Sequence, residues 1–257
     1  HIVDTCKKAI EAKISIYLGG NKGTGKTVFP HYLGKLLPTK PFVYIDCHNS
    51  ALIDEGYLDD QHFELASGGI LFLDDVHRLA NSDQHKLLDW IYEKELKNNI
   101  SIIATGPTHL PEQFRSYGID ERLLSELTSV NLTLPTLKEM NNQIKDYILY
   151  FTKKFGNNEP INKMLDSEML YFTERDWLGN IKELEQAIKQ YFEETMKIDI
   201  EQIPNKLKEQ LITDILNKCN NNVSKTAEYL GMKRPRLYQL IESMKISIKK
   251  RQYTSKQ

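Results

Sequence analysis

The amino-acid sequence predicts an α/β protein, in which a parallel sheet carries helices on both faces and is followed by two all-helical regions. Three observations in the 257 residues support this class. Short apolar runs alternate with amphipathic helical patterns up to about residue 135. A glycine-rich segment follows the first apolar run directly. From residue 139 onward, the hydrophobic spacing is helical only.

The expected strands are four or five residues long and mostly apolar, which is typical of strands buried on both faces of a sheet. They are Ile14–Leu18, Phe42–Asp46, Ile70–Asp74, Ser101–Ala104 and Val130–Leu134. The segments between them have helical spacing and supply the layers above and below the sheet.

The second half is expected to form helices in two groups, separated by a weak segment that contains Pro204. We therefore predict an α/β domain over 1–138, a helical domain over 139–198, a linker over 199–206 and a helical domain over 207–257. Two apolar helix faces define the first helical domain: Ile144, Tyr147, Ile148 and Phe151, and Ile181, Leu184, Ile188 and Phe192.

Charge is unevenly placed along the chain. The net charge is −1, but from Lys206 onward twelve basic residues accompany four acidic ones, so this end carries +8 and the remainder −9. A basic segment of this kind indicates a polyanionic partner.

Cysteine usage and hydropathy indicate a cytoplasmic protein without membrane spans. Cys6, Cys47 and Cys219 show neither metal-ligand spacing nor a disulfide framework. No apolar run approaches the length of a membrane span, and no signal peptide is recognisable. The chain begins at His1, so we expect it to be part of a longer protein with an upstream sensory domain.

The glycine-rich segment is a complete G-x-x-x-x-G-K-[ST] phosphate loop placed after a strand, as that motif requires. Its residues are Gly20, Asn21, Lys22, Gly23, Thr24, Gly25, Lys26 and Thr27. Backbone N–H groups of such a loop converge on phosphates, Lys26 reaches the β and γ oxygens, and Thr27 ligates Mg²⁺. The alternative is an ordinary glycine-rich turn.

A second motif ends the third strand. The apolar run Ile70–Leu73 leads into Asp74 and Asp75, the arrangement called Walker B. Asp74 is expected to hold the Mg²⁺ through water, and Asp75 to polarise the attacking water.

Several segments resemble the signature segments of bacterial enhancer-binding proteins, which are AAA+ transcription activators. They are Pro41–Cys47, Phe63–Asp75, Leu134–Glu139 and Trp177–Glu185, together with Asn221–Tyr238, which is similar to a Fis-type helix-turn-helix. The resemblance covers nearly the whole chain in the family's order. It implies a bacterial cytoplasmic regulator with an AAA+ phosphate-loop sheet, an α-helical lid subdomain and a Fis-type DNA-binding domain.

One departure from the family concerns its partner. The family's GAFTGA loop, which touches sigma-54, should lie between Asn49 and His62, where this chain is too short and lacks the motif. We therefore expect a regulator that works with a sigma-70-type RNA polymerase, or as a repressor, in preference to sigma-54 polymerase.

Other departures fall in the catalytic apparatus. Asp75 replaces a glutamate, which would leave its carboxylate about 1 Å out of place and can cost on the order of 10²-fold in rate. Asp46 stands where the family has an asparagine, although a strand-end turn role explains it better. Sensor I falls on Thr105–Pro107, where Pro107 supplies no amide side chain.

The cationic residues of the apparatus are also altered. Lys182 stands in the place of the sensor II arginine and lacks its bidentate fork. Arg115 and Arg122 remain in the arginine-finger region, but Glu126 falls where a second arginine is expected. A solvated position or a surface ion pair explains Lys182, Arg115 and Arg122 equally well. Five of the seven histidines, His48, His62, His77, His85 and His109, show no metal-ligand spacing and are assigned no chemistry.

The basic end reads as a helix-turn-helix. Val223, Ala227 and Leu230 give its first helix an apolar face, and Gly231 allows the tight turn. Residues expected to face DNA are Lys225, Lys233, Arg234, Arg236, Tyr238 and Gln239, with Lys249–Arg251 on phosphates. The helix Leu207–Lys218 is the expected pairing surface of a dimer on double-stranded DNA. A basic bundle without a specific partner is the alternative.

These observations predict a DNA-binding transcription regulator that binds ATP and Mg²⁺ and hydrolyses ATP weakly or not at all. Two alternatives remain: an active AAA+ ATPase that remodels a transcription partner, and a sensor of a signalling nucleotide such as cyclic di-GMP. The DNA-binding domain implies a dimer and the AAA+ resemblance a hexamer, and the sequence does not choose between them.

Overall fold

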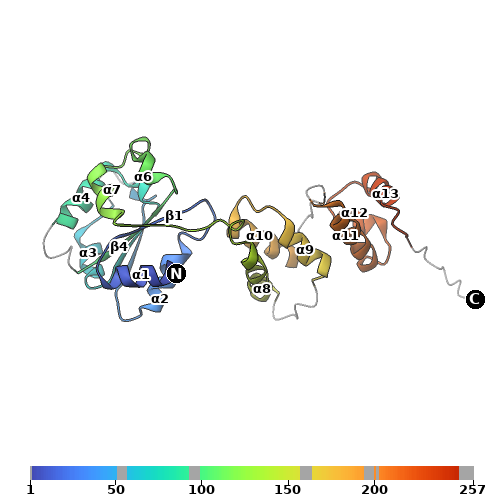
Figure 1. The fold of residues 1–257 in the computed structure, drawn as a ribbon, viewed down its shortest axis with the longest axis horizontal. Coiled ribbons are helices and arrows are strands. Elements are labelled where there is room, and N and C mark those ends of the chain that lie inside the picture. The colour runs from blue at the N-terminus through green and yellow to red at the C-terminus, as the bar shows by residue number, and fades with distance from the viewer. Residues whose placement is uncertain are drawn as a thin grey trace, which may run out of the picture. The chain divides into compact units, whose positions relative to one another are not determined.

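The structure is a computed structural model that describes residues 2–50, 57–92, 99–156, 164–193, 200 and 203–248 (Figure 1). It divides into two units, His1–Glu139 and Met140–Gln257.

The first unit contains a five-stranded parallel sheet in the order β2-β3-β4-β1-β5. The strands are β1 (Ile16–Gly19), β2 (Phe42–Asp46), β3 (Ile70–Asp74), β4 (Ser101–Gly106) and β5 (Val130–Thr133). Every residue of β1, β3 and β4 is buried, whereas the edge strands β2 and β5 are partly exposed. The predicted sheet is therefore confirmed.

The first strand begins two residues later than expected. Lys13 adopts a left-handed conformation (φ 58°), and the Ile14 N–H donates to the carbonyl of Ala9, which closes the end of α1 (Ile2–Glu11). Ile14 is consequently part of a helix C-cap and not of β1.

Side chains alternate between the two faces of the sheet, and each face has its own core. Ile16, Leu18, Ile70 and Phe72 pack with residues of α1 and α2 (Val28–Leu36). The alternate positions, including Tyr17, Leu71 and Leu73, pack with the helices of the opposite layer. These are α3 (Asp60–Ala66), α4 (Asn81–Tyr92), α6 (Leu110–Gln113) and α7 (Glu121–Leu127). Helices on both faces are the predicted architecture.

The second unit is helical. Three helices form a bundle in which α8 packs on both α9 and α10: α8 (Ile144–Phe155), α9 (Asp166–Glu174) and α10 (Asn180–Phe192). Three further helices form what we call the helix-turn-helix module: α11 (Asn205–Lys218), α12 (Val223–Tyr229) and α13 (Arg234–Ser243). The first helix of the module, α11, packs on α12 and also on α9 of the bundle.

Local signals explain the turn between α12 and α13. The Asn222 side chain caps α12 by accepting from the N–H groups of Ser224 and Lys225. Gly231 has a φ of 63° in the turn itself, a conformation that glycine adopts without strain. Ala227, Leu230, Leu237, Leu240 and Ile241 are buried beneath it.

Candidate functional site

The phosphate loop lies at the carboxyl end of β1, between that strand and α2. Gly23 and Gly25 have φ values of 81° and 97°, which a residue with a side chain rarely adopts. A Cβ on Gly20 would meet the Thr24 hydroxyl at 2.7 Å, so the loop is too tight for any larger residue there. The sequence pattern of glycines therefore follows from the backbone path of the loop.

The Lys26 ammonium group folds over this loop. It donates to the carbonyl oxygens of Gly20 at 2.8 Å and Asn21 at 3.2 Å. Burial lowers the pKa of Lys26, and the nearby carboxylates of Asp75 and Asp74 oppose that shift. The loop thus concentrates positive charge where an anion would be received.

Asp74 connects three elements of the sheet edge. One carboxylate oxygen accepts from the Thr27 hydroxyl at 2.7 Å, and the other accepts from the Thr105 hydroxyl at 2.5 Å. Asp74 is only 8% exposed. The register brings these residues together because Leu18 of β1 lies opposite Thr105 of β4, and β4 lies beside β3. The predicted pair Thr27 and Asp74 is therefore adjacent.

Sequence reasoning missed Thr105 as a site residue. Its hydroxyl also accepts from the backbone N–H of Asp75 at 3.0 Å, so one side chain ties the end of β4 to both acidic residues. In the sequence, an asparagine side chain was sought at the sensor I position, Thr105–Pro107. The Thr105 hydroxyl, which lies on β4 itself, hydrogen-bonds Asp74 instead. The position at the end of an interior strand was the available signal.

Asp75 lies in a left-handed conformation (φ 55°) just after β3, where a non-glycine residue is uncommon. Its carboxylate is 3.9 Å from Nδ1 of His48 and 4.0 Å from Nδ1 of His77. His48 lies in turn 3.2 Å from Asp46, whose carboxylate also accepts from the His48 backbone N–H. Asp46 therefore has the strand-end turn role.

The two histidines beside Asp75 were also missed, because metal-ligand spacing was the criterion applied to them. His77 is mostly buried, its Nδ1 has no hydrogen-bond partner among the described residues, and burial lowers its pKa. Within the described ranges, no three His, Cys, Asp or Glu side chains are grouped to hold a metal.

The remaining cations are exposed. Arg122 on α7 forms an ion pair with Asp120 at 3.0 Å, which lowers the pKa of that carboxyl to about 2. Arg115 lies over the ring of Phe114, 5.5 Å from its centroid. Lys182 is exposed on α10, which belongs to the second unit. Among the described residues of the first unit, neither Arg115 nor Arg122 has a hydrogen bond to Asp75.

The residues predicted to face DNA are all exposed. They lie on α12 and at or near the start of α13, and are Lys225, Lys233, Arg234, Arg236, Tyr238 and Gln239. Residues 249–251, also predicted to contact phosphates, lie outside the described residues. An exposed basic helix start of this kind suits the major groove of DNA.

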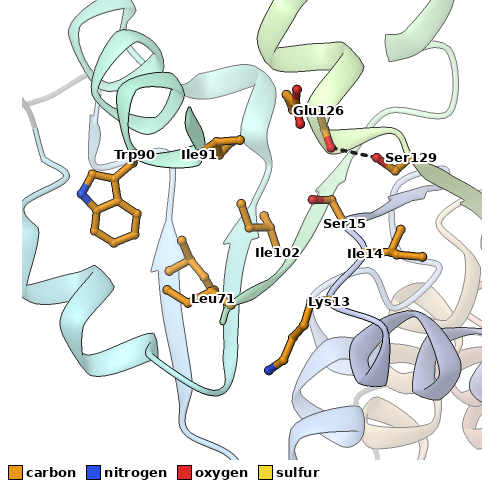
Figure 2. Close-up of a pocket in the computed structure, with 10 residues that line it drawn as sticks. Lys13, Ile14, Ser15, Leu71, Trp90, Ile91, Ile102, Glu126 and Ser129 are labelled. Carbon is orange, nitrogen blue, oxygen red and sulfur yellow. Dashed lines mark hydrogen bonds between the residues drawn. The ribbon is translucent and has the colours of Figure 1, made fainter. Parts of the chain in front are cut away.

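A separate hollow of about 250 Å³ lies at the amino ends of the strands, opposite the phosphate loop (Figure 2). Leu71, Trp90 and Ile102 form apolar walls. The Lys13 ammonium at its edge donates to the carbonyls of Gly68 and Asn99. Because the candidate residues above lie at the carboxyl ends of the strands, this hollow takes no part in the site.

Comparison with known proteins agrees with this arrangement. Residues 1–137 match the model of the Sigma-54 interaction domain. The chain belongs to that family. Residues 207–241 match the bacterial regulatory proteins of the Fis family, which supplies the helix-turn-helix DNA-binding domain. The chain thus combines a sigma-54 interaction domain with a Fis-type helix-turn-helix domain, the combination that the sequence predicted.

Named relatives support the same family. The chain is 25% identical to the Nif-specific regulatory protein of Azospirillum lipoferum over 82% of this chain and 37% of the relative. It is 28% identical to the transcriptional regulatory protein FlbD of Caulobacter vibrioides over 73% of this chain and 47% of FlbD. The chain therefore spans less than half the length of these relatives.

Solved structures share the fold. NtrX from Brucella abortus, crystallised with ATP, has a TM-score of 0.61 at 20% identity, covering 95% of this chain and 66% of NtrX. RuvB from Thermotoga maritima, a Holliday junction branch migration motor, has a TM-score of 0.51 at 18% identity, covering 95% of this chain and 85% of RuvB. Within the described parts of this chain, no helix is long and apolar enough to span a membrane.

Proposed function

We propose that this chain is a DNA-binding transcription regulator of the bacterial cytoplasm whose AAA+ module binds ATP with Mg²⁺ and hydrolyses it slowly. The observation that carries the proposal is the contact between the Thr27 hydroxyl and the Asp74 carboxylate, 2.7 Å apart beside the phosphate loop. In this proposal residues 139–198 are the lid, 199–206 the linker and 207–257 the DNA-binding domain.

The donor set suits Mg²⁺, which prefers hydroxyl, carboxylate, water and phosphate oxygens. Thr27 would ligate the ion directly and Asp74 through water, while Lys26 and the loop N–H groups would hold the phosphates. When bound, the ion would neutralise phosphate charge. Thr105 would keep Asp74 in position through its 2.5 Å hydrogen bond.

Slow hydrolysis follows in this proposal from Asp75. Its side chain is one methylene shorter than glutamate, and both nearby histidines lie within 4.0 Å of it. A carboxylate displaced by about 1 Å can lose on the order of 10²-fold in rate. Arg122 is held by Asp120 and would have to leave that ion pair to serve a neighbouring subunit in a hexamer.

An active ATPase that remodels a transcription partner is the second candidate, and Thr105 favours it. From the sequence, no amide side chain was expected at the sensor I position. The Thr105 hydroxyl instead hydrogen-bonds the Asp74 carboxylate and the Asp75 backbone N–H, and so connects β4 to the end of β3. The two candidates differ in turnover and not in nucleotide binding.

Independence from sigma-54 is supported by the connection between β2 and α3. The buried carboxylate of Asp83 accepts from the Ser50 hydroxyl and from the backbone N–H groups of Tyr57 and Leu58. Both ends of the connection are thereby fixed at one point. Only residues 51–56 separate them, and these lie outside the described residues. A connection of six residues between two fixed ends is shorter than the sigma-54-contacting loop of the family, and its sequence lacks the GAFTGA motif.

Isothermal titration with ATP, ADP and cyclic di-GMP tests nucleotide binding. We expect ATP–Mg²⁺ binding in the wild type and in Lys22→Ala, the matched lysine of the same loop, and loss of binding in Lys26→Ala. If cyclic di-GMP binds and ATP does not, cyclic di-GMP and not ATP would be the ligand of the phosphate loop. No binding of any of the three would overturn the proposal.

Steady-state turnover separates the two candidates. We expect turnover well below about 1 s⁻¹, the low end of typical enzymes, and an increase in Asp75→Glu. Wild-type turnover above that rate would favour the active ATPase.

Transcription in vitro with sigma-70 and sigma-54 polymerases tests which polymerase is the partner. Activation of the sigma-54 enzyme alone would contradict the proposed independence from sigma-54.

A further inference from the structure

A fully buried carboxylate links the bundle to the helix-turn-helix module within the second unit. Glu168 lies on α9 and is 0% exposed. One of its oxygens, Oε2, accepts from the Leu165 N–H at 2.8 Å and from the Tyr191 hydroxyl at 2.6 Å, both within the bundle. The other, Oε1, accepts from Lys218 at 3.0 Å and Tyr229 at 2.8 Å, both of the module.

Because its donors are divided in this way, Glu168 is fully hydrogen-bonded only while the helix-turn-helix module packs on the bundle. A buried carboxylate needs partners for both oxygens, and losing the partners of one leaves an uncompensated acceptor. If the module left the bundle, Oε1 would lose both of these donors. Burial and the charge of Glu168 raise the pKa of Tyr229, so its hydroxyl keeps the proton that it donates.

Lys218 strengthens the link through its surroundings. Its ammonium also donates to the Tyr229 hydroxyl at 2.9 Å. It lies over the rings of Tyr229 and Tyr191, 4.8 Å and 5.5 Å from their centroids, which adds cation–π attraction from both sides of the contact. The charge of Glu168 is therefore matched by a cation at the end of α11.

Apolar packing accompanies these polar contacts. Leu207, Leu211, Ile212, Ile215 and Leu216 are the apolar residues of α11, and all are buried within this one chain. The exposed positions of α11 include Glu209, Gln210 and Asn217 and are polar. Pairing of two copies through Leu211, Ile215 and Leu216, as the sequence suggested, would require α11 to rearrange.

The docking contact does not cover the predicted DNA-facing surface. Lys233, Arg234, Arg236, Tyr238 and Gln239 lie on or beside the first turns of α13 and are exposed. The docked module can therefore present its recognition helix while it remains attached to the bundle.

We propose that Glu168 is a latch that docks the helix-turn-helix module on the α8–α10 bundle, so that a nucleotide-driven movement of the bundle is passed to the recognition helix. This rests on the proposed function, in which the bundle is the lid of a nucleotide site. The partner of the latch is the Lys218 and Tyr229 pair on the module.

Two tyrosines give a matched test of docking. Tyr191→Phe and Tyr229→Phe each remove one hydroxyl that donates to Glu168, but only Tyr229 belongs to the module. Hydrogen exchange of the whole chain should show faster exchange in α11 for Tyr229→Phe, and faster still for Lys218→Met/Tyr229→Phe. We expect about tenfold or more in the double variant. Tyr191→Phe should raise exchange in α11 less than Tyr229→Phe does, because Tyr191 belongs to the bundle and the variant keeps its ring contact with Lys218. Equal effects of the two tyrosine variants, or unchanged exchange in the double variant, would overturn the latch.

Transmission is tested with a DNA duplex selected from a random pool by the wild-type protein. The double variant should bind this duplex without ATP as the wild type does, but ATP should no longer change its affinity. An ATP effect equal to that of the wild type would overturn the proposal. If ATP binds but leaves the wild-type affinity unchanged, no movement is passed to the recognition helix, and this overturns the transmission part of the proposal. If ATP does not bind, the proposed function itself fails, and hydrogen exchange still decides whether Glu168 docks the module.

Discussion

Replacing Thr105 with valine tests whether its hydroxyl organises the acidic edge of the sheet. The change keeps the side-chain volume but removes two hydrogen bonds, one donated to Asp74 at 2.5 Å and one accepted from the Asp75 N–H at 3.0 Å. A hydrogen bond to a charged group contributes about 1.5–3 kcal/mol, and an amide left without a partner costs about 1 kcal/mol or more. We therefore expect a loss of about 3 kcal/mol in the free energy of unfolding of the first unit.

The assay is thermal unfolding without nucleotide or Mg²⁺, followed by tryptophan fluorescence. The chain has two tryptophans, so in a Trp177→Phe background Trp90 alone reports on the first unit. At about 3 °C per kcal/mol for a domain of this size, the midpoint should fall by roughly 10 °C. Thr128→Val is the control, because its hydroxyl donates only to the Leu124 carbonyl one turn earlier in the chain. A fall below about 3 °C, or one no larger than in the control, would refute the reasoning.

Three further predictions concern other groups. Asp83→Asn should lower the stability of the first unit by about 3 kcal/mol or more, because a buried acceptor of several hydrogen bonds loses its charge, and urea unfolding measures this. Burial lowers the folded pKa of His77, so the unfolded state binds more protons and stability should fall as the pH drops below about 6.5. His77→Gln should flatten the melting midpoint between pH 5 and 6.5, and an unchanged slope would contradict this. Arg236→Ala should weaken sequence-specific binding by about 1–3 kcal/mol if it contacts a base, whereas Lys225→Ala should weaken all sequences alike and reduce the salt slope, as fluorescence anisotropy can measure.

Some parts of the fold could be predicted because their signals are local. Apolar runs such as Ile70–Leu73 are buried on both faces, so they must be interior strands of a parallel sheet. The glycines of the phosphate loop are required by its own backbone angles. Gly231 and the Asn222 cap likewise mark the turn of the helix-turn-helix from within a few residues.

Local patterns failed where the role of a residue depends on a neighbouring helix or strand. Ile14 fits a strand pattern, but its N–H closes the end of α1. His48 and His77 lack metal-ligand spacing; His77 follows Asp75 by two residues, whereas the pairing of β2 with β3 brings His48 to it. The apolar face of α11 indicates burial, but the sequence cannot say whether a second copy or the same chain covers it.

The family, the parallel sheet, the phosphate loop and the DNA-binding end could be predicted from the sequence, because each depends on residues that are neighbours along the chain. The side chains that complete the candidate site, and the contacts that hold the second unit together, became known from the three-dimensional fold. Thr105 reaches Asp74 across 31 positions, and Tyr229 reaches Glu168 across 61. A hydrogen bond forms only when its two groups lie about 3 Å apart. For these pairs, strand register and helix docking bring the groups together, and no local sequence pattern indicates that.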